Sequence, residues 1–181
     1  YERLYIQWSL SKFFPAKTMG SHVTNWNKNT SVKFRTDVCS SCKLGFDIDL
    51  KSLSEDDYKF VQQAVKNYNS MKPVILEGDQ YRLVSPYEGS HCAVNYVSKD
   101  KQRAVLFAYD LHPRYKEPQM NVKLQGLNPT KLYTVKETNL MPGKTSELEC
   151  DGKQYSGDYL MKVGLSVFSA QDGTSHVLTL E

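Results

Sequence analysis

The chain has 181 residues, of which 40% are hydrophobic and 24% charged, and its formal net charge is +3. This is the composition of a globular protein, and it excludes wholesale disorder. The lysines are scattered among acids, so neither nucleic acid nor a membrane is an expected partner. No apolar run approaches the roughly 20 residues that a membrane span requires. The opening YERLYIQWSL lacks the pattern of a signal peptide. It reads as the middle of a secondary-structure element, so we expect a longer parent chain.

The first part of the chain has mostly helical periodicity. An opening helix must end before Pro15, because the residue before a proline disfavours helical geometry. Ser54 and Asp57 fit a capping box at the start of the best-marked helix, and we expect Pro73 to close it. The opening helix is expected to stop before Pro15, the next helices are expected at residues 32–44 and from Ser54 to Pro73, and a short strand-like run lies at residues 19–24.

After residue 79 the periodicity changes to two. Short β-rich runs are separated by turn signals such as Asn-Pro, Pro-Gly and Asp-Gly, and a short helical piece lies around residues 157–163. Such runs without long helices between them indicate an antiparallel sandwich. The runs are QYRLV, HCAVNYV, RAVLFAY, MNVKLQGL, KLYTVKE, SELEC and SHVLTL.

A strand between two helices is typical of one βα unit of a parallel barrel or sheet, and such a unit cannot stand alone. We therefore expect the missing strands to lie upstream in a parent chain or to come from another copy. Without such a cover, the strand at residues 19–24 and five apolar side chains would be exposed. These side chains are Leu4, Ile6, Trp8, Phe13 and Phe14.

Four cysteines raise the possibility of a thiol-redox or zinc protein. Cys39 and Cys42 form a CSSC motif, whereas Cys92 and Cys150 stand alone. A structural zinc site normally needs two close pairs of ligands, so the metal hypothesis is weak. The flanking sequence TDVCSSCKLGFDI reads as one helix with small residues facing a core. We therefore expect buried free thiols, no metal site and no cofactor.

The acidic residues offer no convincing pair for acid/base catalysis. Asp47 and Asp49 are expected to flank a helix end, and Asp56 and Asp57 to begin a capped helix, where acids favour the helix dipole. Three further aspartates lie beside expected turns, where this residue is common for its local hydrogen bonds. They are Asp110, Asp151 and Asp158.

Five segments, in this order and spacing, carry a resemblance to a known family. They are RLYIQWSLSKFFPAKTMGSHVT, LGFDIDL, YRLVSP, LQGLNPTKLYTV and YSGDYLMKVGL. Together they resemble the C-terminal third of glycoside hydrolase family 36, the α-galactosidases. MGSHV is similar to the last strand of the catalytic barrel in that family, and YSGDYLMKVGL to its closing sandwich motif. After HVT, however, this chain reads NWNKNT where many members carry a Pro-Asn-His-Gln-Thr type loop.

The resemblance implies an α+β fragment: the last βα part of a TIM (β/α)8 barrel followed by an antiparallel Greek-key β-sandwich. Residues 1–78 would be the end of the barrel, with a helix, the last strand and two helices. Residues 79–181 would be the sandwich domain. The whole protein would be a retaining hydrolase acting on terminal α-linked galactose in oligosaccharides.

The resemblance also implies that no catalytic residue lies in this chain. Both catalytic aspartates of the family would lie upstream, so the isolated chain is expected to be inactive and mainly structural. Two alternatives stay open: an α-N-acetylgalactosaminidase of the same family, and a carbohydrate-binding β-sandwich module. The second would require exposed aromatic side chains in a row, whereas four tyrosines lie within strand patterns. They are Tyr81, Tyr96, Tyr109 and Tyr133.

If residues 19–24 are a barrel strand, three residues are candidates for the substrate pocket. Active sites of such barrels lie at the carboxyl ends of the strands. Gly20 would leave room beside the pocket, His22 would form hydrogen bonds there, and Trp26 could offer its face to a sugar. In the alternative, His22 only orients its neighbours and Trp26 packs under the sandwich.

Overall fold

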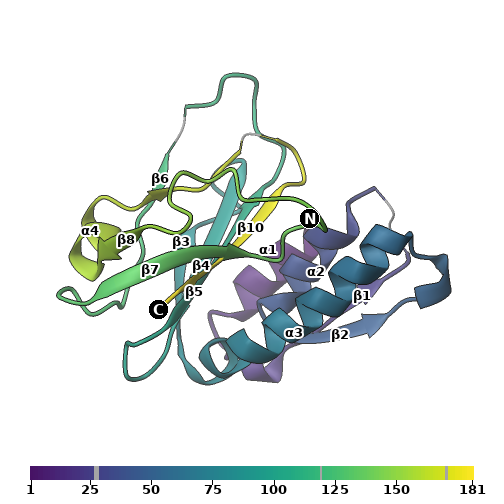
Figure 1. Cartoon of the computed structure of the whole chain (residues 1–181), viewed down its shortest axis with the longest axis horizontal. Helices are drawn as coiled ribbons and strands as arrows, with labels where there is room; N and C mark the ends of the chain where they lie inside the picture. Colours follow the sequence, from purple (N-terminus) through teal and green to yellow (C-terminus); the bar gives the residue numbers. More distant parts are fainter. Residues whose placement is uncertain (27–28, 119, 170) are drawn as a thin grey trace.

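A six-stranded antiparallel sheet forms the centre of the computed structural model, which describes residues 1–26, 29–118, 120–169 and 171–181 (Figure 1). The strand order is β3-β4-β5-β10-β7-β8. The last strand in sequence, β10, therefore lies between β5 and β7. The strands are β3 (Asp79–Val84), β4 (His91–Val97), β5 (Ala104–Asp110), β7 (Leu132–Thr138), β8 (Gln154–Ser156) and β10 (Ser175–Leu180).

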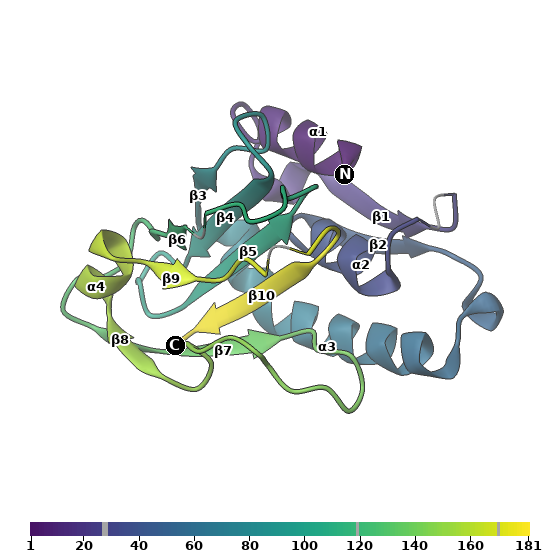
Figure 2. The same ribbon diagram turned by 90° about the horizontal axis from the view of Figure 1, so that it is seen from above.

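Three helices cover one face of this sheet, and a parallel pair of strands, β1 (Gly20–Thr24) and β2 (Lys43–Asp47), lies on their far side (Figure 2). Two short 3-10 turns, Ala16–Thr18 and Leu50–Ser52, connect these elements. No helix in the described part of the chain is long and apolar enough to cross a membrane. The three helices are α1 (Glu2–Leu10), α2 (Val32–Ser40) and α3 (Glu55–Glu77).

The other face is covered by a smaller layer of β6 (Asn121–Val122), β9 (Leu165–Ser166) and α4 (Gly157–Lys162) (Figure 1). Because both faces are covered, β4 and β5 are buried along their whole length. The expected change from helices to an antiparallel sheet is confirmed, and the fold is α+β. Two expected strands differ: SELEC forms no strand, and MNVKLQGL contributes only the two residues of β6.

The hydrophobic core on the helical side draws on both proposed domains. Phe34 from α2 and Met71 from α3 pack in one cluster with Tyr96 and Phe107 from the sheet. The core on the other face is built from residues after 79 alone, among them Leu106, Leu124 and Leu160. The domain boundary near residue 79 stays a prediction, but the sheet needs the first 78 residues to cover one of its faces.

The opening helix is less exposed than the sequence suggested. Leu4 and Trp8 are buried against the sheet, so the expectation that they need cover from another polypeptide was wrong. Ile6, Phe13 and Phe14 are exposed, as expected. The amphipathic helix α1 therefore turns one face to this chain's own sheet and leaves the other uncovered.

The expected helix at residues 32–44 was wrong in its second part. The helix ends at Ser40, where the hydroxyl groups of Ser40 and Ser41 donate to the carbonyl oxygens of Thr36 and Val38, at 2.7 and 2.9 Å. Such bonds satisfy carbonyl groups that a helix end leaves free. The chain then enters β2, which pairs in parallel with β1. MGSHV is thus followed by a further parallel strand and is not the last one.

Pro73 does not end the third helix. Helix α3 begins where expected, with the Ser54 hydroxyl accepting from the Asp57 amide, but it continues to Glu77. The residues after the proline, Val74 and Ile75, are 2% and 1% exposed in the core on the helical side. Their burial offsets the cost of an internal proline, about 3 kcal/mol.

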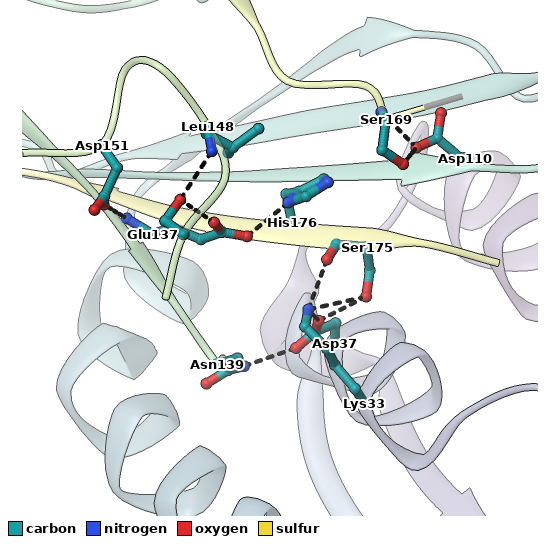
Figure 3. A network of polar contacts seen from close by, with 11 residues as sticks. Lys33, Asp37, Asp110, Glu137, Asn139, Leu148, Asp151, Ser169, Ser175 and His176 are labelled. Carbon is teal, nitrogen blue, oxygen red and sulfur yellow. Dashed lines mark hydrogen bonds and ion pairs between the residues drawn. The ribbon is translucent and has the colours of Figure 1, made fainter. Parts of the chain in front are cut away.

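A buried polar network ties α2 to the sheet (Figure 3). The Asp37 carboxylate, which is fully buried, lies 2.7 Å from Lys33 Nζ and accepts from Ser175 Oγ at 2.7 Å and from Asn139 Nδ2 at 2.8 Å. Lys33 Nζ also donates to the Ser175 carbonyl oxygen at 2.6 Å. The helix that packs on β1 and β2 is thus held by β10 and by the end of β7.

Candidate functional site

Strand β1 separates its side chains into two sets. Ser21 and Val23 are each 1% exposed, whereas Gly20 and His22 are exposed on the opposite face and Thr24 is half-buried. This alternation follows from the two-residue period of a strand with one covered face. His22 is therefore held on a regular strand and points away from the covered face.

The neighbouring strand leaves room for the His22 ring. Gly45 of β2 is paired in register with His22. A Cβ atom at Gly45 would lie 2.3 Å from His22 Cδ2 and 2.7 Å from Nε2, both too close for real contacts. The ring therefore lies over Gly45, and a larger residue at this position would have to displace it.

A hollow of about 630 Å³ opens beside β1. Its wall comes from the start of α1, from β1 and the loop after it, from α2, and from two loops of the sheet. The lining residues are Tyr1, Glu2, Arg3, His22, Val23, Thr24, Trp26, Asn29, Thr30, Phe34, Arg35, Val38, Cys39, His112 and Asp172.

Two of the three residues predicted from the sequence line this hollow. His22 and Trp26 belong to its wall, and Gly20 does not. A Cβ atom at Gly20 would meet nothing within 4 Å. Trp26 is 91% exposed, so the alternative in which it packs under the sandwich is wrong.

Two arginines of the wall were missed by the sequence analysis. Arg35 Nη1 donates to the Thr24 carbonyl oxygen at 2.5 Å, and Arg3 Nη1 lies 3.4 Å from Ser21 Oγ. Gln7 Nε2 donates to the same hydroxyl at 3.0 Å. The helices thus hold both ends of β1 through charged and polar side chains. In the sequence, these arginines look like ordinary solvated helix positions.

The sheet contributes a third part of the wall, through Asp172 and His112. The Tyr1 hydroxyl donates to Asp172 Oδ1 at 2.6 Å. This bond from Tyr1 is the main reason why the pKa of Asp172 lies below its usual value. Burial and the same carboxylate raise the pKa of the Tyr1 phenol to about 12. Nothing in the sequence links residues 171 positions apart.

The acidic pairs weighed from the sequence have structural roles. Asp49 caps a 3-10 turn by accepting from the Lys51 amide at 3.0 Å, and Asp47 ends β2, so neither flanks an α-helix. Asp56 and Asp57 lie in the first turn of α3, as expected. None of these four carboxylates lines the hollow.

Two buried clusters contain serine, histidine and a carboxylate, but neither has the arrangement of a catalytic triad. Ser146 Oγ and His176 Nδ1 both bind Glu137, the second at 2.6 Å (Figure 3). Burial favours neutral Glu137, but these bonds hold its pKa below the usual value. A nucleophilic serine must contact the histidine, which acts as its base. Here the serine donates to the carboxylate and accepts from the Leu148 amide at 3.2 Å, and the histidine binds the carboxylate instead of the serine.

The second cluster joins His91, Asp110 and Ser169. Ser169 Oγ donates to Asp110 Oδ2 at 2.8 Å. His91 Nδ1 lies 2.8 Å from Asp110 Oδ1, but the approach lies outside hydrogen-bond geometry. The cluster fastens the ends of β4 and β5 to the loop before β10. Asp110 is thus a buried structural residue at the end of β5.

All four cysteines are free and buried, as expected. Cys39 lies in α2, but Cys42 follows that helix, so the expectation of a single helix around both was wrong. Burial raises the pKa of the Cys39 thiol, and it raises the pKa of Cys42 to about 12. Among the described residues, no group of three or more His, Cys, Asp or Glu could hold a metal ion.

These thiols should be unreactive in the folded chain, because the thiolate is the reactive form and burial disfavours it. We expect an aromatic disulfide reagent to label neither Cys39 nor Cys42 in buffer and to label both in denaturant. Metal analysis should find no stoichiometric zinc. Rapid labelling of the native chain, or a mass two hydrogens lower than that of the reduced chain, would contradict this prediction.

Two family models match successive parts of the chain. Residues 1–78 match Melibiase, and residues 91–180 match the glycosyl hydrolase family 36 C-terminal domain. A probable α-galactosidase G of Aspergillus terreus is 28% identical over 99% of this chain and 24% of its own length. A probable α-galactosidase C of Aspergillus flavus is 31% identical over 99% of this chain and 23% of its own length. The chain thus spans about a quarter of these relatives.

Solved structures agree with the sequence matches. The family 36 α-galactosidase AgaB of Geobacillus stearothermophilus has a TM-score of 0.85 and 28% identity, covering 99% of this chain and 24% of its own. A variant of AgaA from the same organism, solved with raffinose, has a TM-score of 0.85 and 26% identity over the same shares. Because these matches agree over almost its whole length, the chain belongs to glycoside hydrolase family 36, as a segment that includes the family's C-terminal domain.

Proposed function

We propose that this chain is the C-terminal part of a retaining α-galactosidase that removes terminal α-linked galactose from oligosaccharides. The observation that carries the proposal is the continuous similarity to family 36 α-galactosidases across both halves of the chain. The hollow beside β1 supports it, because it lies next to a parallel strand and is lined by an exposed aromatic ring, a histidine and two arginines. Pockets that bind small ligands combine such apolar surface with a few polar groups.

The helical half is proposed to be the end of a (β/α)8 barrel. In support, β1 and β2 are parallel and joined through α2, which packs on both. Within the described residues β1 pairs with β2 alone, so its other edge is free for a preceding strand. That strand would come from the upstream part of the parent chain or from another copy. The sheet and its small β6–β9 layer would then be the Greek-key sandwich.

In this proposal the chain supplies binding groups and no catalytic carboxylate. A retaining hydrolase needs two carboxylates about 5 Å apart on either side of the glycosidic bond. The hollow has two acidic residues, Glu2 and Asp172, and Asp172 is already bound by Tyr1. The resemblance implies that both catalytic aspartates lie upstream. His22 would then bind a sugar hydroxyl, Trp26 would stack against a sugar face, and Gly20 would leave space nearby.

The substrate class follows from the relatives. AgaA variants have been solved with raffinose and with stachyose, which are α-galactosides. An α-N-acetylgalactosaminidase is the alternative within the family. A carbohydrate-binding module is less supported, because the exposed Tyr87 and Tyr115 lie in separate loops and Tyr87 bonds to Ser9 at 2.9 Å.

The test compares the full-length protein with the isolated 181-residue chain. With an aryl α-galactoside, the full-length protein should turn over substrate, and the isolated chain should stay at background. An aryl α-N-acetylgalactosaminide in parallel separates the two specificities. Activity of the purified isolated chain that is lost on mutating one of its own acids would contradict the proposal.

Trp26→Ala in the full-length protein should raise KM for raffinose roughly 10-fold, equivalent to about 1.4 kcal/mol, because a stacked aromatic face is lost. Tyr58→Ala is the matched control, since Tyr58 is a 41% exposed aromatic on α3 outside the hollow. Equal KM values for the two variants would remove Trp26 from the proposed pocket.

A further inference from the structure

The sheet half of the molecule builds a socket for the Tyr1 side chain at the rim of the hollow. The phenol donates to Asp172 Oδ1 at 2.6 Å, and its ring meets the His112 ring edge-on, with centroids 4.4 Å apart. On its other side the same ring packs edge-on against Phe34 of α2, at 5.3 Å. Tyr1 is thus held between the helical half and two loops of the sheet.

The socket is fixed by hydrogen bonds that backbone amides form between those two loops. The His112 amide donates to Asp172 Oδ1 at 3.0 Å, and the Gly173 amide donates to the Asp110 carbonyl oxygen at 3.1 Å. His112 and Gly173 both adopt positive φ, 66° and 70°. Positive φ is uncommon for a residue other than glycine, and it persists where the surrounding contacts hold it. The loops therefore meet in one defined geometry.

Gly173 also makes the space that the phenol occupies. A Cβ atom at this position would lie 3.0 Å from the Tyr1 hydroxyl oxygen. The Asp-Gly pair thus does two things: Asp172 supplies the acceptor, and Gly173 lets the donor approach. The depressed pKa of Asp172 and the raised pKa of Tyr1 keep acceptor and donor in their bonding forms through neutral pH.

Tyr1 lies in the wall of the proposed site, where its position affects the shape of the hollow. It directly precedes α1 and lines the hollow together with Arg3 of that helix and His112 of the sheet. A ring that could rotate freely here would change the width of the hollow at its rim. Asp172 lines the hollow from the side of the sheet, where it accepts the hydrogen bond of the Tyr1 hydroxyl.

We propose that Asp172, Gly173 and His112 are positioning residues that hold Tyr1 in the wall of the substrate site. The sheet domain then sets the shape of the site, in addition to covering the helices. This inference rests on the proposed function, because it takes the hollow as part of the galactoside pocket.

The test uses the full-length protein and steady-state kinetics with raffinose. Asp172→Ala should raise KM roughly 10-fold and change kcat less than about 2-fold, because a hydrogen bond to a charged acceptor is lost away from the bond that is cleaved. Tyr1→Phe should give the same KM, and the double variant should be no worse than either single one, since all three lack the same bond. Asp172→Asn keeps an acceptor oxygen and should recover most of the wild-type KM.

Asp79→Ala is the matched control. Asp79 is an exposed aspartate of the same sheet that pairs with Lys99, and it lies outside the hollow. Its KM should equal that of the wild type. If Asp172→Ala lowers the melting temperature but leaves KM unchanged, the positioning role is overturned and Asp172 is only structural. A wild-type protein that cleaves no α-galactoside would instead overturn the proposed function.

Discussion

Asp37→Ala is expected to lower the free energy of unfolding of the chain by about 3–5 kcal/mol, because breaking a buried ion pair leaves an uncompensated charge. The Lys33 side chain is 16% exposed and would keep its ammonium group beside the Ser175 carbonyl without its carboxylate. Ser175 and Asn139 would each lose the acceptor of a buried hydrogen bond (Figure 3). Urea unfolding of the isolated chain, with the midpoint and slope fitted together, measures the effect.

Asp158→Ala provides the comparison. Asp158 also pairs with a lysine four residues away, Lys162, but both side chains are largely exposed. Its loss should cost about 1 kcal/mol or less. Replacing Lys33 and Asp37 together by Met and Leu should recover much of the lost stability, since no charge then stays buried. Similar costs for Asp37→Ala and Asp158→Ala would mean that the network contributes little.

Gly45→Val is expected to lower kcat/KM of the full-length protein about 100-fold, because it displaces the His22 ring. The Cβ atom would lie 2.3 Å from His22 Cδ2, so the ring must move. Displacing a substrate-positioning group by about 1 Å can cost on the order of 10²-fold. Steady-state kinetics with an aryl α-galactoside measures this effect.

Two controls separate this mechanism from a general loss of structure. Gly89→Ala lies in the loop between β3 and β4, where a Cβ atom meets nothing within 4 Å, and it should leave activity unchanged. In a His22→Ala background, Gly45→Val should have little further effect, because the two changes share one target. A fully additive double variant would show that Gly45 acts by another route.

Local signals in the sequence predicted most elements of this fold. The capping pattern at Ser54 identified the start of α3, and alternating or continuous apolar runs identified the main strands of the sheet. These features depend on neighbours within a few residues, which the sequence displays directly. The family resemblance, shown by the matches at residues 1–78 and 91–180, added the order of the two halves.

Pairing and packing between distant segments escaped the sequence analysis. Strand β2 continues directly from a helical pattern, and it is a strand because β1 lies beside it. Pro73 stays within a helix because the residues after it are buried by the sheet. Tertiary contacts of this kind override local propensity.

The sequence predicted only part of the candidate site, because the other residues of the site come from distant segments of the chain. His22 and Trp26 follow from the strand and the loop after it, and both line the hollow. Asp172 and His112 reach the same wall from the far half of the chain, through loops that only the folded sheet brings together. Whether His22 and Trp26 touch a sugar stays a prediction.

The central position of β10 has a consequence for how the protein is made. A ribosome releases β5 and β7 well before residues 175–180, yet both strands need β10 as their shared neighbour. Until these residues emerge, one edge of β5 and one edge of β7 lack their neighbouring strand. The Asp37 carboxylate also lacks its hydrogen bond from Ser175. Strand pairings between residues that are far apart in sequence form slowly, and unpaired strand edges can pair with strands of other chains. We therefore expect the nascent chain to depend on chaperones until β10 has emerged.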